Sequence, residues 1–167
     1  MNSCSSVDRR RPGIRVITLG CSKNLVDTEH LLAQVKDRFE IFPEDDERPV
    51  DYLLINTCGF IGDAKEESIQ AILEAVELKK AGKVGTLLVF GCLSQRYQDE
   101  ILSEMPEVDG VLGTGSYDDV VSVVERLLVG ETVSEFGDIH APMSEAGRIL
   151  TTPDYYAYLK IAEGCDN

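Results

Sequence analysis

Short apolar runs alternate along this chain with longer segments in which apolar residues recur every three or four positions. The apolar runs at 14–19, 52–55, 86–90 and 110–112 predict strands, and the segments between them predict amphipathic helices. Because the runs lack polar alternation, they are typical of parallel strands that helices cover on both faces. The order of elements therefore predicts an α/β fold.

In more detail, we expect an open parallel sheet of about five strands with helices on both faces, a three-layer sandwich of the flavodoxin or Rossmann kind. Three helices are predicted from apolar residues at helical spacing, and a weaker fourth from 95–105. The three sets are Leu25, Leu32, Val35 and Phe39; Ile69, Ile72, Leu73 and Val76; and Val120, Val124, Leu127 and Leu128.

The two ends of the chain differ from this central pattern. Residues 1–13 are rich in Ser and Arg without an apolar period and predict a mobile tail, so the domain is expected at 14–140. A stretch with Pro, Gly and Ser at 141–154 indicates a linker, and 155–161 is a new strand-like run within a last unit at 155–167. A terminal strand without a partner indicates the front part of a longer protein.

Charge narrows the classes of partner. The 167 residues carry 30 Asp and Glu against 16 Lys and Arg, a formal charge of −14. Such a chain repels a phosphate backbone, so direct nucleic-acid binding is not expected. No run approaches the roughly 18–20 apolar residues of a membrane span, and no secretory leader is apparent, so we expect a cytoplasmic protein without membrane contact.

Three of the five cysteines, Cys21, Cys58 and Cys92, each follow a predicted strand and lie beside a glycine. Because the carboxyl ends of parallel strands meet at one edge of a sheet, the pattern predicts that these thiols share a rim. Three thiolates suit an iron-sulfur cluster better than structural zinc, which favours four ligands and closely spaced Cys pairs. A 4Fe-4S cluster held in this way keeps one iron free of protein ligands.

Other readings of these residues are weaker. Any one of the three cysteines could be a small buried hydrophobe, but all three at matching positions are hard to explain in that way. Cys92 and Arg96 are too close for a low-molecular-weight phosphatase loop, which needs five residues between them. His30 and His140 show no ligand spacing.

Four segments carry a resemblance to a known family: LGCSKNLVDTE, NTCGFIGDAKEES, FGCLSQRY and MPEVDGVLGTGSYDD. They resemble the N-terminal domain of the radical-AdoMet methylthiotransferases, in particular the RimO type that acts on a small-subunit ribosomal protein. The tRNA-modifying MiaB type usually has Gln-Met-Asn after the first cysteine, where this chain has Ser22-Lys23-Asn24. The MiaB type therefore remains the alternative, and a non-catalytic flavodoxin-like module is the alternative from another class.

The resemblance implies that Cys21, Cys58 and Cys92 hold an auxiliary 4Fe-4S cluster. It implies that Cys165 is the first ligand of a second 4Fe-4S cluster, whose other two cysteines lie beyond this chain. In the full-length enzyme that second cluster cleaves S-adenosyl-L-methionine to a radical that attacks the β-carbon of a target aspartate, with electrons from a reducing partner. The auxiliary cluster supplies the sulfur, so this chain alone is expected to be catalytically inactive.

The resemblance also suggests supporting roles for four polar residues. Asn24 and Asp27 would cap or orient the loop that carries Cys21. Asn56 and Thr57 would hydrogen-bond the cluster sulfurs or the loop of Cys58, an outer-shell effect that tunes potential. Cys4 matches no motif and is expected to be incidental.

Overall fold

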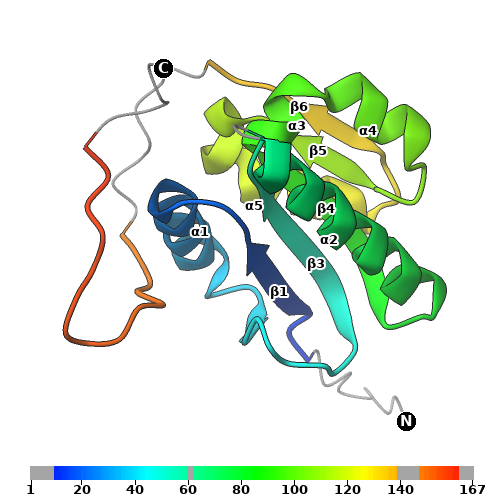
Figure 1. The fold of residues 1–167 in the computed structure, drawn as a ribbon. Coiled ribbons are helices and arrows are strands. Elements are labelled where there is room, and N and C mark those ends of the chain that lie inside the picture. The colour runs from blue at the N-terminus through cyan, green and yellow to red at the C-terminus, as the bar shows by residue number, and fades with distance from the viewer. Residues whose placement is uncertain (1–9, 60–61, 139–146, 162–167) are drawn as a thin grey trace, which may run out of the picture.

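The computed structural model describes residues 10–59, 62–138 and 147–161, and these contain one six-stranded sheet whose strands are all parallel. Its order is β2-β1-β3-β4-β5-β6, as Figure 1 shows. The strands are β1 (Gly13–Thr18), β2 (Glu40–Phe42), β3 (Val50–Thr57), β4 (Val84–Gly91), β5 (Gly110–Leu112) and β6 (Val133–Glu135). The predicted open parallel sheet is confirmed.

Helices cover both faces of the sheet. They are α1 (Ser22–Val35), α2 (Gly62–Lys80), α3 (Cys92–Arg96), α4 (Gln98–Glu104) and α5 (Val120–Leu128), with a short 3-10 helix at Thr114–Asp119. One apolar cluster joins α1 and α5 to one face, and the other joins α2, α3 and α4 to the opposite face. Leu54 points into the first cluster and its neighbours Leu53 and Ile55 into the second, so β3 is buried on both sides. The three-layer sandwich follows from this burial.

The chain order of the strands reverses once. After β1 the chain forms β2 on one side and then crosses to the other side of β1 to form β3. Each later strand is added beyond the previous one. The boundary between β1 and β3 is therefore the topological switch point, the place where open α/β sheets bind ligands beyond the carboxyl ends of their strands.

The structure differs from the sequence prediction at several elements. The two edge strands β2 and β6 were not predicted, because three residues are too few to show a period. The first helix ends at Val35, and Phe39 lies beyond it with its ring edge-on to Tyr52, at 5.5 Å between ring centroids. The weak helix expected at 95–105 is two short helices, α3 and α4, that meet at Tyr97.

The C-terminal segment also departs from the expectation. Residues 155–161, predicted as a strand, contain neither strand nor helix. A strand needs a neighbouring strand for its backbone hydrogen bonds, and no strand pairs with this segment among the described residues. The segment from 147 to 161 instead lies against α1, and we call it the docked segment (Figure 1, orange to red).

Candidate functional site

The three predicted cysteines lie at the carboxyl ends of three adjacent strands. Cys21 follows β1 by way of Leu19 and Gly20, Cys58 directly follows β3, and Cys92 directly follows β4. The strand β3 pairs with β1 on one side and with β4 on the other. Neighbouring strands are about 4.8 Å apart, so the three residues lie along one edge. We call these three residues and the loops that carry them the cysteine rim.

The rim includes the switch point of the sheet. Cys21 and Cys58 end the two strands between which the strand order reverses, β1 and β3. At such a point the following segments leave toward opposite faces of the sheet, which opens a crevice at the strand ends. Here α1 covers one face and α2 covers the other. The cysteines thus lie where this fold class places its ligands.

Glycines let the neighbouring loops of the rim approach closely. A Cβ at Gly20 would lie 2.5 Å from Cys58 Cβ and 2.9 Å from its Sγ, and one at Gly91 would lie 2.5 Å from the Thr57 oxygen. Both glycines also have positive φ, +89° and +104°, a region that other residues rarely adopt. A Cβ at Gly59 would lie 2.9 Å from Leu93 Cα. The glycines therefore allow neighbouring loops of the protein to contact one another closely at the rim.

Asn24 joins the first two loops of the rim. Its side-chain amide donates to the carbonyl of Leu19, at 2.8 Å, and to that of Thr57, at 3.2 Å. Its Oδ1 lies 4.0 Å from Cys21 Sγ. A buried amide with these partners links the ends of β1 and β3. The orienting of the Cys21 loop by Asn24 stays a prediction.

Asn56 and Thr57 bind backbone and side-chain groups around the rim. The Asn56 amide donates to Asn24 O at 2.8 Å and to Thr28 Oγ1 at 3.1 Å, and Thr57 Oγ1 donates to Phe90 O at 2.7 Å. Asn56 Oδ1 is buried without a hydrogen-bond partner in the part of the chain that the structure describes. These side chains connect β3 to α1 and to β4, so they hold the strand ends in place.

Asp27 makes a contact that its sequence motif did not predict. Its Oδ1 lies 2.6 Å from Lys160 Nζ, in an ion pair with both side chains largely buried. The partner residue belongs to the docked segment, more than a hundred residues later in the chain. Asp27 thus contacts the docked segment, and its orienting of the Cys21 loop stays a prediction.

Two buried serines of the rim were missed by sequence reasoning. Ser68 Oγ accepts from Cys58 N at 3.0 Å and donates to Cys58 O at 2.8 Å. Ser94 Oγ lies 2.8 Å from Gly91 O and 2.6 Å from Leu112 O. Ser68 lies one turn before Ile72 on the apolar face of α2, and a polar residue on such a face was the available signal.

The three thiols differ in exposure: Cys21 is exposed, Cys92 is half-buried and Cys58 is buried. Among the described residues, no three His, Cys, Asp or Glu side chains lie close enough to ligate one metal ion. A 4Fe-4S cluster places each thiolate on a different iron, so its ligands are spread more widely than those of one ion. Three cysteine side chains are donors of the type that such clusters use.

The remaining sequence candidates lie elsewhere. His30 Nδ1 is 2.9 Å from Gly147 O, where it contacts the docked segment. Cys4, His140 and Cys165 lie outside the residues that the structure describes.

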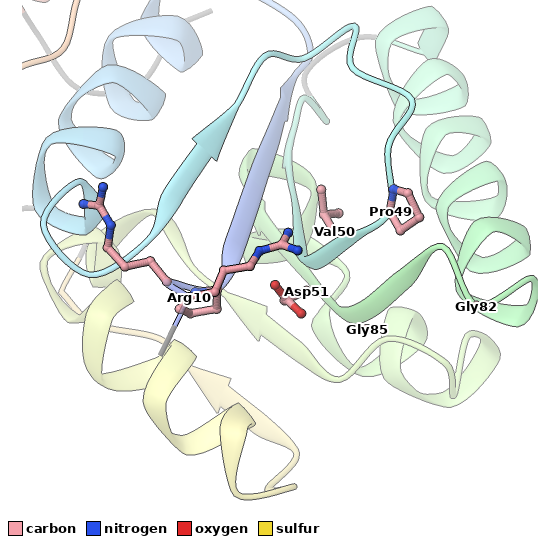
Figure 2. A pocket seen from close by; sticks show the side chains of 8 residues that line it. Arg10, Pro49, Val50, Asp51, Gly82 and Gly85 are labelled. Carbon is pink, nitrogen blue, oxygen red and sulfur yellow. The ribbon is translucent and has the colours of Figure 1, made fainter. Parts of the chain in front are cut away.

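A pocket of about 450 Å³ lies at the opposite end of the sheet, where β3 and β4 begin (Figure 2). Its lining comprises Arg10, Arg11, Pro12, Pro49, Val50, Asp51, Gly82 and Gly85. Asp51 Oδ2 accepts from Gly13 N at 2.6 Å, so this carboxylate serves the start of β1. The pocket is remote from the cysteine rim and shares no residue with it.

In the described part of the chain, no helix is both long enough and apolar enough to cross a membrane.

The sheet order, its switch point and the thiols at its carboxyl edge define a doubly wound α/β domain with a cysteine-bearing rim. Residues 13–113 match the family described as "Uncharacterized protein family UPF0004". The chain belongs to this family, the N-terminal domain of the MiaB and RimO methylthiotransferases.

Relatives with curated names agree with the predicted resemblance. The chain is 51% identical over 152 residues to a "Ribosomal protein uS12 methylthiotransferase RimO" of Lachnoclostridium phytofermentans, 90% of this chain and 34% of the relative. Relatives of the same name in Thermoanaerobacter sp. and Syntrophotalea carbinolica are 49% and 44% identical, over 92% and 100% of this chain and 35% and 36% of their own length. The chain spans about a third of the length of the curated relatives it matches.

Proposed function

We propose that this chain binds the auxiliary 4Fe-4S cluster of a methylthiotransferase through Cys21, Cys58 and Cys92. The observation that carries the proposal is the position of these residues at the carboxyl ends of β1, β3 and β4, around the switch point of the sheet. Cysteine side chains there are suitable ligands for iron, because thiolates hold iron-sulfur clusters in proteins. Relatives named as methylthiotransferases support the same function.

The protein groups around the thiols would fix the geometry of the ligands. Asn24 spans the ends of β1 and β3, and Ser68 binds both backbone groups of Cys58. Partners of this kind orient ligands and tune a metal centre through its outer shell. When bound, the cluster would supply an iron without a protein ligand, at which sulfur could be delivered. The exposure of Cys21 leaves that side of the rim open to the rest of the enzyme.

In the full-length protein we propose methylthiolation of the β-carbon of an aspartate in a small-subunit ribosomal protein. The support is the name of the relatives, which are ribosomal protein uS12 methylthiotransferases. The reaction would use S-adenosyl-L-methionine and a second 4Fe-4S cluster, with Cys165 as a ligand and a reducing partner as electron source. We place this activity in the cytoplasm.

The proposed domain layout follows from the same assignment. Residues 14–140 would form the cluster-binding domain after a tail at 1–13. Residues 141–154 would connect it to a radical-AdoMet domain that begins at 155–167. The described part of this connection, from residue 147 onward, contacts α1.

Anaerobic reconstitution with iron and sulfide tests the ligand set. We expect about four irons per chain for the unchanged protein. Cys21→Ala, Cys58→Ala and Cys92→Ala should each prevent stable assembly, while Cys4→Ala and Cys165→Ala should leave the iron content unchanged. Full iron content in all three rim variants would refute the proposed ligands, and loss of iron in Cys165→Ala would show that the site lies elsewhere.

A further inference from the structure

The docked segment, residues 147–161, is held to α1 mainly by polar contacts (Figure 1). Glu29 is its first anchor, with a side chain that is 0% exposed. Its carboxylate accepts from Arg148 Nε at 2.6 Å, from Thr151 N at 2.7 Å and from Thr151 Oγ1 at 3.0 Å. The Glu29 backbone oxygen also accepts from Ile149 N, at 3.1 Å. A buried carboxylate is tolerated only with such partners, so Glu29 depends on the docked segment.

Asp27 is the second anchor, two positions earlier in α1. It binds Lys160, at the other end of the docked segment from Arg148, and both side chains of this pair are at most 10% exposed. The segment also bonds to itself between the two anchors: Arg148 Nη1 donates to Tyr158 O at 2.5 Å, and Thr152 Oγ1 donates to Tyr156 O at 2.8 Å. The two anchors thus close the segment into a loop whose two ends are held within one turn of one helix.

Ile149 of the docked segment is partly buried against the apolar cluster of α1 and α5, but other large apolar side chains of the segment face the opposite way. Tyr155, Leu159 and Ile161 are 84%, 82% and 88% exposed, whereas Arg148 and Lys160 turn toward α1. Burial of apolar surface, the usual force that docks a segment, is therefore small here. The contacts at the two ends of the segment are thus made mainly with the carboxylates of α1.

We propose that Asp27 and Glu29 are positioning residues that hold the outgoing chain at a fixed place relative to the cysteine rim. Cys21 immediately precedes α1, and Asp27 lies six positions further, about 9 Å along a helix axis. One helix thus has a rim cysteine at its start and, close to it, the two carboxylates that hold the outgoing chain. We call Asp27 and Glu29, with their partners in the docked segment, the clamp. Lys160 is five positions before Cys165 in the sequence. This inference rests on the proposed function, because the clamp would set the distance between the two proposed clusters.

Hydrogen exchange in the chain as it stands tests the clamp without any cluster. In the double variant Asp27→Asn/Glu29→Gln, amides of 147–161 should exchange about tenfold faster or more, because charge-assisted hydrogen bonds are lost. Amides of β3 and β4 should keep their rates. The matched control is Glu74→Gln, which removes one charge from the exposed face of α2. Unchanged exchange in the double variant would overturn the clamp.

A variant in the docked segment covers the case in which the double variant does not fold. Lys160→Gln leaves the sequence of α1 unchanged and removes the ammonium group that Asp27 binds. We expect faster exchange of the amides near residue 160 and faster trypsin cleavage after Arg148, with the melting temperature of the sheet domain preserved. Protection equal to that of the unchanged chain would show that the pair does not hold the segment.

The positioning role is tested in the full-length protein. Pulsed electron paramagnetic resonance measures the distance distribution between the two reduced clusters, and the double variant should broaden it while the iron content stays the same. A merely structural role would leave the distribution unchanged, and that result would refute the positioning role. If the protein without substitutions bound no iron after reconstitution, the proposed function would fail. The hydrogen-exchange experiment would still test the clamp, because it needs no cluster.

Discussion

The sheet domain and the docked segment at 147–161 are held by opposite kinds of contact. In the sheet domain, apolar side chains such as Leu54 and Leu88 are fully buried between helices. In the docked segment, charged groups turn inward to Asp27 and Glu29, and large apolar side chains such as Leu159 turn outward. The same chain therefore contains a part that burial stabilises and a part whose position depends on two carboxylates.

This difference means that one kind of contact stabilises the sheet domain and another kind positions the docked segment. Burial of apolar area is non-directional and supplies most of the free energy of folding. Paired buried charges add little net stability, but they have strict geometric requirements. We therefore expect the sheet domain to fold independently of any cluster, and the docked segment to respond to single changes in α1.

The largest expected effect compares two leucines. Leu54→Ala should lower the free energy of unfolding by about 3 kcal/mol, because it opens a cavity in the core. Leu159→Ala should change it by less than about 0.5 kcal/mol, because that side chain is already in solvent. Urea unfolding followed by circular dichroism measures both. Equal losses would show that the docked segment is part of the cooperative core.

A smaller effect is expected from two glycines with positive φ. Gly91→Ala at the cysteine rim should lower the free energy of unfolding by about 2 kcal/mol, because of backbone strain and contact with the Thr57 oxygen. Gly82→Ala, where no atom lies within 4 Å, should cost only about 1 kcal/mol from the backbone conformation. Thermal melts of the two variants compare them, and a Gly91→Ala chain as stable as Gly82→Ala would mean that the rim loops are loosely packed.

The smallest effect concerns pH. Burial, with a further contribution from the charge of Asp51, raises the pKa of Tyr52 from 10.0 to about 12. The folded state therefore favours the neutral phenol. This contribution is fully present below the unfolded pKa of 10.0, and it is lost as pH rises toward 12.

Tyr52→Phe removes this titration and keeps the ring next to Phe39. Its stability should fall less than that of the unchanged chain between pH 10 and pH 12. Denaturant titrations at a series of alkaline pH values measure the difference. Parallel pH profiles for the two proteins would place the Tyr52 hydroxyl in contact with water.

Sequence reasoning identified the elements with strong local signals. The central strands have long apolar runs, and the order of elements implied the parallel sheet, which in turn implied a shared edge for Cys21, Cys58 and Cys92. The edge strands β2 and β6 were missed because three residues carry no detectable period. Ser68 was missed because its meaning depends on the loop of Cys58 that lies across from it.

The docked segment could not have been predicted from local pattern. Asp27 and Glu29 are buried in α1, as are Asn24 and Thr28. Charged residues are almost never fully buried unless they are paired, and the local sequence does not show their partners. Their partners, Lys160 and Arg148, are 133 and 119 positions away in the chain. A pair at such separation has no periodic signature, and only the folded arrangement brings its members together.

The central claim is that three thiolates at the rim hold a cluster and leave one iron without a protein ligand. Electron paramagnetic resonance of the reduced, reconstituted chain, recorded with and without methanethiolate, tests it most directly. If only Cys21, Cys58 and Cys92 coordinate, added methanethiolate should shift the signal, because it replaces an exchangeable ligand on the fourth iron. An unchanged signal at saturating methanethiolate would contradict the account, since it would mean that a fourth protein group occupies that position.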